Sequence, residues 1–125
     1  MVVEAVTAPV VHGEGPHWAA PFLYFVDISS SALHRLDTSS SSAGNLSSWT
    51  VAPGDGAVSL AVPLASAPHR RLVISRDRQL LEFDADTGAV GATLADADAG
   101  RPGNRFNDGK VDPSGRLWAG TQIFK

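Results

Sequence analysis

The chain has 125 residues, enough for one domain at most, and its thirteen acidic and ten basic residues give a formal net charge of −3. No Lys/Arg cluster is longer than Arg70–Arg71, which argues against nucleic-acid binding. The absence of cysteine excludes disulfides, thiolate metal sites and a cysteine nucleophile. No apolar run approaches the roughly 20 residues that span a bilayer, and Met1–Val11 does not resemble a secretory signal. We therefore expect a cytoplasmic protein with no nucleic-acid, membrane or defined protein partner.

Short apolar or alternating segments, separated by turn residues, follow one another along the whole chain. This pattern is typical of β-strands, and no window longer than a turn or two has a helical period. In chain order, the predicted strands cover residues 15–18, 23–28, 33–36, 48–51, 58–64, 72–75, 79–83, 90–94, 106–112 and 117–120.

Two sequence elements recur along the chain at a spacing of 45–49 residues. Apolar segments begin at Leu23, Leu72 and Leu117, which are 49 and 45 residues apart, and a second element begins at Leu33 and Leu80, 47 residues apart. Four strands per repeat of this length are typical of a β-propeller blade, with an antiparallel sandwich as the alternative.

The repeat predicts an all-β fold in which the chain is the N-terminal portion of a single β-propeller domain. The predicted blades cover about 14–51, about 58–94 and, as a partial blade, about 106–125. A closed propeller needs at least about four blades, and this chain supplies about two and a half.

The candidate functional residues lie where the chain enters the first strand of a blade. In a propeller these strands line the central channel, so their entrances converge on one face of the ring. Glu14 and Asp108 occupy such entrances, with Arg105 and Asn107 just before Asp108. Glu14 suits a ligand for a hard divalent cation, a general base, or a solvated turn acid. Arg105 and Asn107 either belong to a turn or hold a polyhydroxylated or acidic ligand.

Three motifs resemble those of one known family. They are GEGPHW at 13–18, LYFVDI at 23–28, and NRFNDGKVDPSGR at 104–116 followed by WAGT at 118–121. On these residues the chain resembles the gluconolactonases and regucalcin (senescence marker protein), a family of six-bladed propellers. The segment from Arg105 to Gly109 argues against a related propeller hydrolase of the paraoxonase or strictosidine synthase type.

The resemblance implies a site with one divalent cation, calcium or zinc first and magnesium or manganese next. Glu14 matches the family's first metal ligand, and Arg105 and Asn107 match residues that contact the sugar lactone. The family's other two protein ligands, one of them the proposed general base, would lie beyond Lys125, so no catalytic base is assigned within the chain.

The function implied by the resemblance is that of a metal-dependent sugar lactonase, which opens an aldonolactone ring by hydrolysis. The alternatives are a non-enzymatic calcium-binding protein and an inactive truncated fragment. Because the later metal ligands are missing, we expect the isolated 125-residue chain to be inactive.

Overall fold

Ten β-strands, and no helix, make up the part of the chain that the computed structural model describes, namely residues 1–39, 45–51 and 56–123. The strands are β1 (Gly13–Ala19), β2 (Phe22–Asp27), β3 (Ala32–Asp37), β4 (Leu46–Thr50), β5 (Ala61–Pro63), β6 (Arg71–Arg76), β7 (Gln79–Asp84), β8 (Ala89–Asp96), β9 (Asn104–Val111) and β10 (Leu117–Ile123). Each overlaps one predicted strand, and the all-β class is confirmed. Residues 124 and 125 of the predicted third blade lie outside the described residues.

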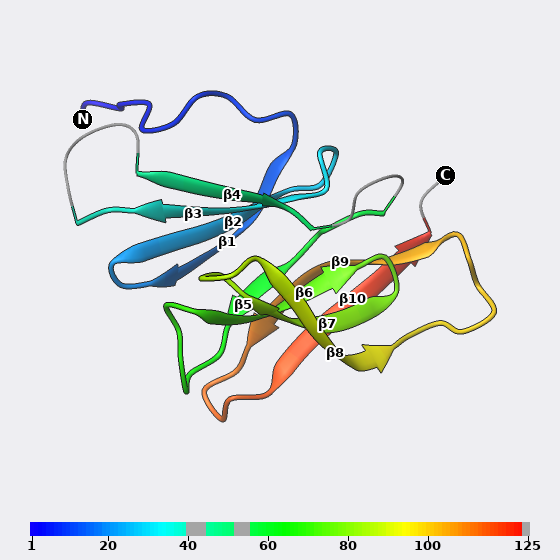
Figure 1. Cartoon of the computed structure of the whole chain (residues 1–125). Helices are drawn as coiled ribbons and strands as arrows, with labels where there is room; N and C mark the ends of the chain where they lie inside the picture. Colours follow the sequence, from blue (N-terminus) through cyan, green and yellow to red (C-terminus); the bar gives the residue numbers. More distant parts are fainter. Residues whose placement is uncertain (40–44, 52–55, 124–125) are drawn as a thin grey trace.

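The strands form two four-stranded sheets and one hairpin, each in simple chain order (Figure 1). The first sheet has the order β1-β2-β3-β4, the second has the order β5-β6-β7-β8, and β9 pairs with β10. All neighbours are antiparallel, as short connections between successive strands require. This arrangement agrees with two four-stranded repeats followed by the start of a third.

Two of the first strands, β1 and β9, contain a β-bulge. In β1, Gly15 and Pro16 lie between the pairs Glu14–Val26 and His17–Tyr24, where β2 has one residue. Gly15 adopts a φ of 58°, a conformation that glycine reaches without the strain a Cβ would cause. In β9 the two residues between the paired positions are Asn107 and Asp108. Bulges redirect side chains and are frequent beside functional sites, and these two lie next to Glu14 and at Asn107, both predicted site residues.

The main hydrophobic core lies between the first two sheets. β2, β3, β6 and β7 contribute their apolar positions to it, because each of these strands has one neighbouring strand on either side and a sheet against one face. Trp49 covers this core, with its ring edge-on to Phe83 at a centroid distance of 5.7 Å. The buried residues of this core are Tyr24, Val26, Ile28, Leu33, Val51, Val58, Ala61, Leu72, Ile74, Leu81, Phe83 and Ala85.

The hairpin packs against the second sheet mainly through Phe106, and the partly buried Leu117 of β10 packs against the cluster that contains Phe106. Phe106 in β9 joins Leu60 and Val62 in a small separate cluster, and the Phe106 amide donates to the main-chain oxygen of Asp77 at 2.7 Å. On β10, by contrast, Trp118 is 63% exposed and Ile123 is 64% exposed. Packing therefore fixes β9 much more than β10.

Candidate functional site

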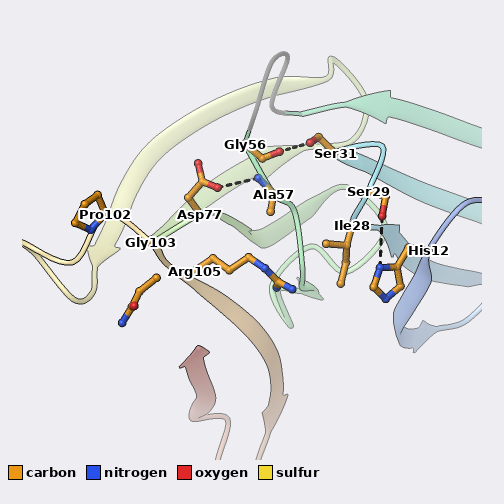
Figure 2. A pocket seen from close by; sticks show the side chains of 11 residues that line it. His12, Ile28, Ser29, Ser31, Gly56, Ala57, Asp77, Pro102, Gly103 and Arg105 are labelled. Carbon is orange, nitrogen blue, oxygen red and sulfur yellow. Dashed lines mark hydrogen bonds between the residues drawn. The ribbon is translucent and has the colours of Figure 1, made fainter. Parts of the chain in front are cut away.

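A cavity of about 480 Å³ opens on the face where the chain enters the first strands (Figure 2). His12, which precedes β1, Ala57, which precedes β5, and Gly103, which precedes β9, all line it. The turn between β2 and β3 closes one side, where the Ser31 hydroxyl donates to the main-chain oxygen of Gly56. Segments far apart in the sequence thus meet at one place, as the propeller topology predicts.

Arg105 is the buried cation of this cavity. It is the second residue of β9 and only 6% exposed, and its side chain extends from that strand towards Ile28 and His12 (Figure 2). The guanidinium Nη1 donates to the main-chain oxygen of Phe106 at 2.9 Å and to the Oδ1 atom of Asn107 at 3.3 Å. The structure therefore brings the two predicted substrate-contacting residues, Arg105 and Asn107, into direct contact.

Glu14 lies in β1, opposite Val26, with an exposed side chain. It is not one of the residues that line the cavity, and within the described ranges its carboxylate makes no hydrogen bond or ion pair. A carboxylate that stabilises no neighbour is available to a ligand. Its place on the strand is set by the bulge at Gly15, which follows immediately.

The described residues do not by themselves form a metal centre. In residues 1–39, 45–51 and 56–123, no group of three or more His, Asp or Glu side chains is placed to hold an ion. Glu14 can supply one oxygen ligand, whereas a calcium site usually has about 6–8 oxygen ligands. Glu14 therefore fits the role of a single ligand, and any complete site needs donors from outside the described part of this chain.

Asp27, which the sequence analysis did not single out, positions the entrance to β1. Asp27 is a buried residue, only 3% exposed. Its carboxylate accepts from the main-chain N–H groups of Val11 at 2.9 Å and His12 at 3.0 Å, and from the Ser30 hydroxyl at 2.9 Å. Burial alone would raise the pKa of Asp27, but these hydrogen bonds outweigh it and leave the pKa below its usual value. The acidic residue that follows four apolar residues in the LYFVDI motif is the sequence signal for this role.

His17, further along β1, is partly buried. Partial burial lowers its pKa, and the positive charge of Lys110 on β9 lowers it further. Its Nδ1 atom lies 3.3 Å from the main-chain oxygen of Gly15.

Four-stranded antiparallel sheets with polar residues at the entrances of their first strands define a β-propeller-type protein. The family described as SMP-30/gluconolactonase/LRE-like region matches residues 12–125. The chain therefore belongs to this family, and the resemblance seen in its motifs is confirmed.

The relatives of this chain include both lactonases and regucalcins. The chain is 36% identical to the 6-deoxy-6-sulfogluconolactonase of Pseudomonas putida over 93% of its own length and 37% of that protein. It is 34% identical to regucalcin of Xenopus laevis, over 87% of this chain and 34% of that one. It is 35% identical to a pentonolactonase of Haloferax volcanii, with the same two shares.

Solved structures give the same fold. A luciferin-regenerating enzyme superposes with a TM-score of 0.77 at 32% identity, over 91% of this chain and 37% of that one. A regucalcin of Agrobacterium tumefaciens, described as a calcium-binding protein, superposes with a TM-score of 0.74 at 27% identity, over 93% and 37%. The chain thus spans little more than a third of the proteins it matches. Among the described residues, no helix is long and apolar enough to cross a membrane.

Proposed function

We propose that this chain is the N-terminal portion of a divalent-metal-dependent sugar lactonase, which hydrolyses an aldonolactone to the open-chain acid. The observation that carries the proposal is the contact between Arg105 and Asn107 at the entrance of β9, beside a cavity of about 480 Å³. Relatives named sulfogluconolactonase and pentonolactonase support a sugar lactone as the substrate class.

Arg105 and Asn107 would bind and orient the lactone. The Asn107 amide oxygen already accepts from Arg105, so the Asn107 NH₂ group is the part that can donate to a sugar oxygen. The Arg105 guanidinium is fixed by the Phe106 carbonyl, so little of its freedom remains to be lost when a substrate binds. Both side chains therefore suit recognition of a rigid, hydroxyl-rich ring.

Glu14 would hold the cation as one of several ligands, the others coming from residues beyond Lys125. When bound, a divalent cation polarises a carbonyl oxygen and lowers the pKa of a coordinated water. A hard oxygen ligand such as Glu14 suits calcium, magnesium or manganese, and zinc also accepts carboxylates. Calcium is supported further by the structural relative that is described as a calcium-binding protein.

The test is hydrolysis of D-glucono-1,5-lactone, followed as acid release with calcium, zinc, magnesium or manganese added in turn. It compares the 125-residue chain with a completed protein, in which residues 12–123 are joined to the part of the Pseudomonas putida relative beyond its match. We expect metal-dependent turnover from the completed protein and none from the chain alone. A completed protein that binds calcium but opens no sugar lactone would favour the non-enzymatic alternative.

A further inference from the structure

A chain of buried hydroxyl groups joins the second sheet to the backbone of β9. Ser59 and Ser75 are both 0% exposed, although serine is usually a surface residue. Ser59 precedes β5 and Ser75 lies in β6, and their Oγ atoms are 3.0 Å apart. The Ser59 hydroxyl also lies 2.5 Å from the main-chain oxygen of Phe106 in β9. The two serines therefore add polar contacts where the small apolar cluster around Phe106 ends.

The direction of each hydrogen bond in this chain follows from the protons available. Ser75 Oγ accepts from the main-chain N–H groups of Ser59, at 2.9 Å, and Leu60, at 3.1 Å. The Phe106 carbonyl has no proton, so the Ser59 hydroxyl donates to it. Because the Ser59 proton is then in use, the Ser75 hydroxyl donates to Ser59 Oγ. The donors thus run in one direction, from Ser75 through Ser59 to Phe106.

The Phe106 carbonyl at the end of this chain is also the one that fixes Arg105. Its oxygen has two lone pairs, and it accepts from the Ser59 hydroxyl and from Arg105 Nη1, the latter at 2.9 Å. The serine hydroxyl restrains the plane and direction of this carbonyl, and the guanidinium must follow it. In a buried site each hydrogen bond of such a network also polarises the next.

We propose that Ser59 and Ser75 are positioning residues for Arg105. Neither serine lines the cavity, so neither touches a ligand there, and both act through the Phe106 carbonyl. The inference rests on the proposed function, in which Arg105 contacts the lactone. It predicts that the Ser59 hydroxyl controls how firmly Arg105 is held, independently of the packing of the first sheet.

The experiment measures how fast phenylglyoxal modifies each arginine of the folded 125-residue chain, by mass spectrometry of its peptides. Ser59→Ala removes the donor to Phe106. Ser48→Ala is the matched control, because it removes a strand hydroxyl that instead lies 2.8 Å from His34 Nδ1 in the first sheet. Arg35, also in the first sheet and shielded with 18% of its side chain exposed, reports general loosening.

In Ser59→Ala we expect modification of Arg105 to accelerate by about 2- to 10-fold, the effect of losing one buried hydrogen bond, with Arg35 unchanged. Ser48→Ala should leave the modification rates of Arg105 and Arg35 unchanged. Ser59→Thr, which keeps the hydroxyl, should modify Arg105 as slowly as the wild type does. An unchanged Arg105 rate in Ser59→Ala overturns the proposal. If Ser59→Ala loosens the whole chain, Ser59→Cys keeps a heavier atom at the same place with a weaker donor; equal acceleration at Arg105 and Arg35 in that variant also overturns it.

Protection by D-gluconate, the expected product, is measured in the completed protein described under the proposed function, and it separates this inference from that function. Slower modification of wild-type Arg105 in its presence supports lactone recognition at this site. Faster modification in Ser59→Ala without any protection by D-gluconate supports the positioning role and counts against the proposed function. Protection by D-gluconate together with an unchanged Arg105 rate in Ser59→Ala supports the proposed function and overturns the positioning role.

Discussion

The first two sheets share a continuous buried core, whereas the β9–β10 hairpin is held by Phe106, by the hydroxyl of Ser59 and by hydrogen bonds of its entering loop. Glu14 belongs to the first region, and Arg105 and Asn107 belong to the second. The residues proposed to bind substrate therefore stand on the less densely packed region. Its inner strand is fixed by a few specific contacts, and its outer strand exposes large apolar side chains.

The position of Arg105 is therefore set by local contacts of β9 and not by the packing of the main core. The twelve-residue core could remain intact while β9 moves, because Phe106 packs with Leu60 and Val62 in a separate cluster. Local opening free energies generally differ between such regions of one protein. The predictions below test this separation.

The largest effect is expected where an aromatic side chain fills the main core. Phe83→Ala should lower the free energy of unfolding by about 3–5 kcal/mol, because Phe83 is 2% exposed and packs against Trp49. The matched control is Trp118→Ala, which truncates an aromatic residue that is 63% exposed and should cost less than about 1 kcal/mol. Urea unfolding followed by circular dichroism measures both. Equal losses would contradict the contrast between core and hairpin.

The next effect concerns the contact that holds β9. Phe106→Ala should cost about 2–4 kcal/mol locally, because it empties the centre of the cluster with Leu60 and Val62. Hydrogen exchange should then accelerate in β9 and β10 while β2 and β3 keep their protection. Ile123→Ala, at a position that is 64% exposed, is the control and should leave both regions unchanged. Uniform acceleration across all strands would show that the two regions form one cooperative unit.

A smaller, pH-dependent effect is expected at Asp27, which fixes the entrance to β1. Asp27→Asn should cost roughly 1–2 kcal/mol near neutral pH, because it removes the charge that four hydrogen-bond donors stabilise. Since the pKa of Asp27 is lower in the folded chain, its contribution is complete above the unfolded pKa of about 3.9. As the pH falls through the folded pKa, that contribution is lost. The difference in urea midpoint between wild type and Asp27→Asn should therefore shrink as the pH falls below the unfolded pKa of about 3.9; a constant difference would contradict this account.

The smallest effect on stability is expected at Glu14. Glu14→Gln should change the free energy of unfolding by no more than about 0.5 kcal/mol, because the carboxylate is exposed and pairs with no described residue. Glu82→Gln is a useful comparison, since it removes an ion pair with Arg71 at 2.6 Å. A loss of about 1 kcal/mol or more for Glu14→Gln would reveal a structural partner and weaken its assignment as a ligand.

Much of the fold could be predicted because strands and turns have local signals. Alternation and turn residues located all ten strands, and the recurring spacing indicated four strands per sheet. The contact between Arg105 and Asn107 also has a local origin, because residues two apart on a strand point to the same face. The bulge at Asn107 and Asp108 was not predicted, since it depends on the register of β10.

The features that the sequence did not reveal depend on long-range contacts. Ser59 reaches Phe106 across 47 residues of sequence, and Asp27 reaches Val11 across 16. No periodicity announces such contacts, because they arise only when sheets pack together. Likewise, the sequence placed Glu14 with Arg105 at converging entrances, yet only Arg105 lines the cavity. The wall of that cavity comes mainly from loops, whose conformations have weak sequence signals.

We propose that Glu14 binds a cation and that Asn107 binds a sugar lactone, and a comparison of three forms of the completed protein tests this claim. Calcium affinity by isothermal titration and the kinetics of D-glucono-1,5-lactone hydrolysis are measured for wild type, Glu14→Gln and Asn107→Ala. We expect Glu14→Gln to weaken both calcium binding and turnover. Asn107→Ala should raise KM or lower kcat while leaving calcium affinity nearly intact. Unchanged calcium affinity in Glu14→Gln, or unchanged kinetics in Asn107→Ala, would contradict the claim.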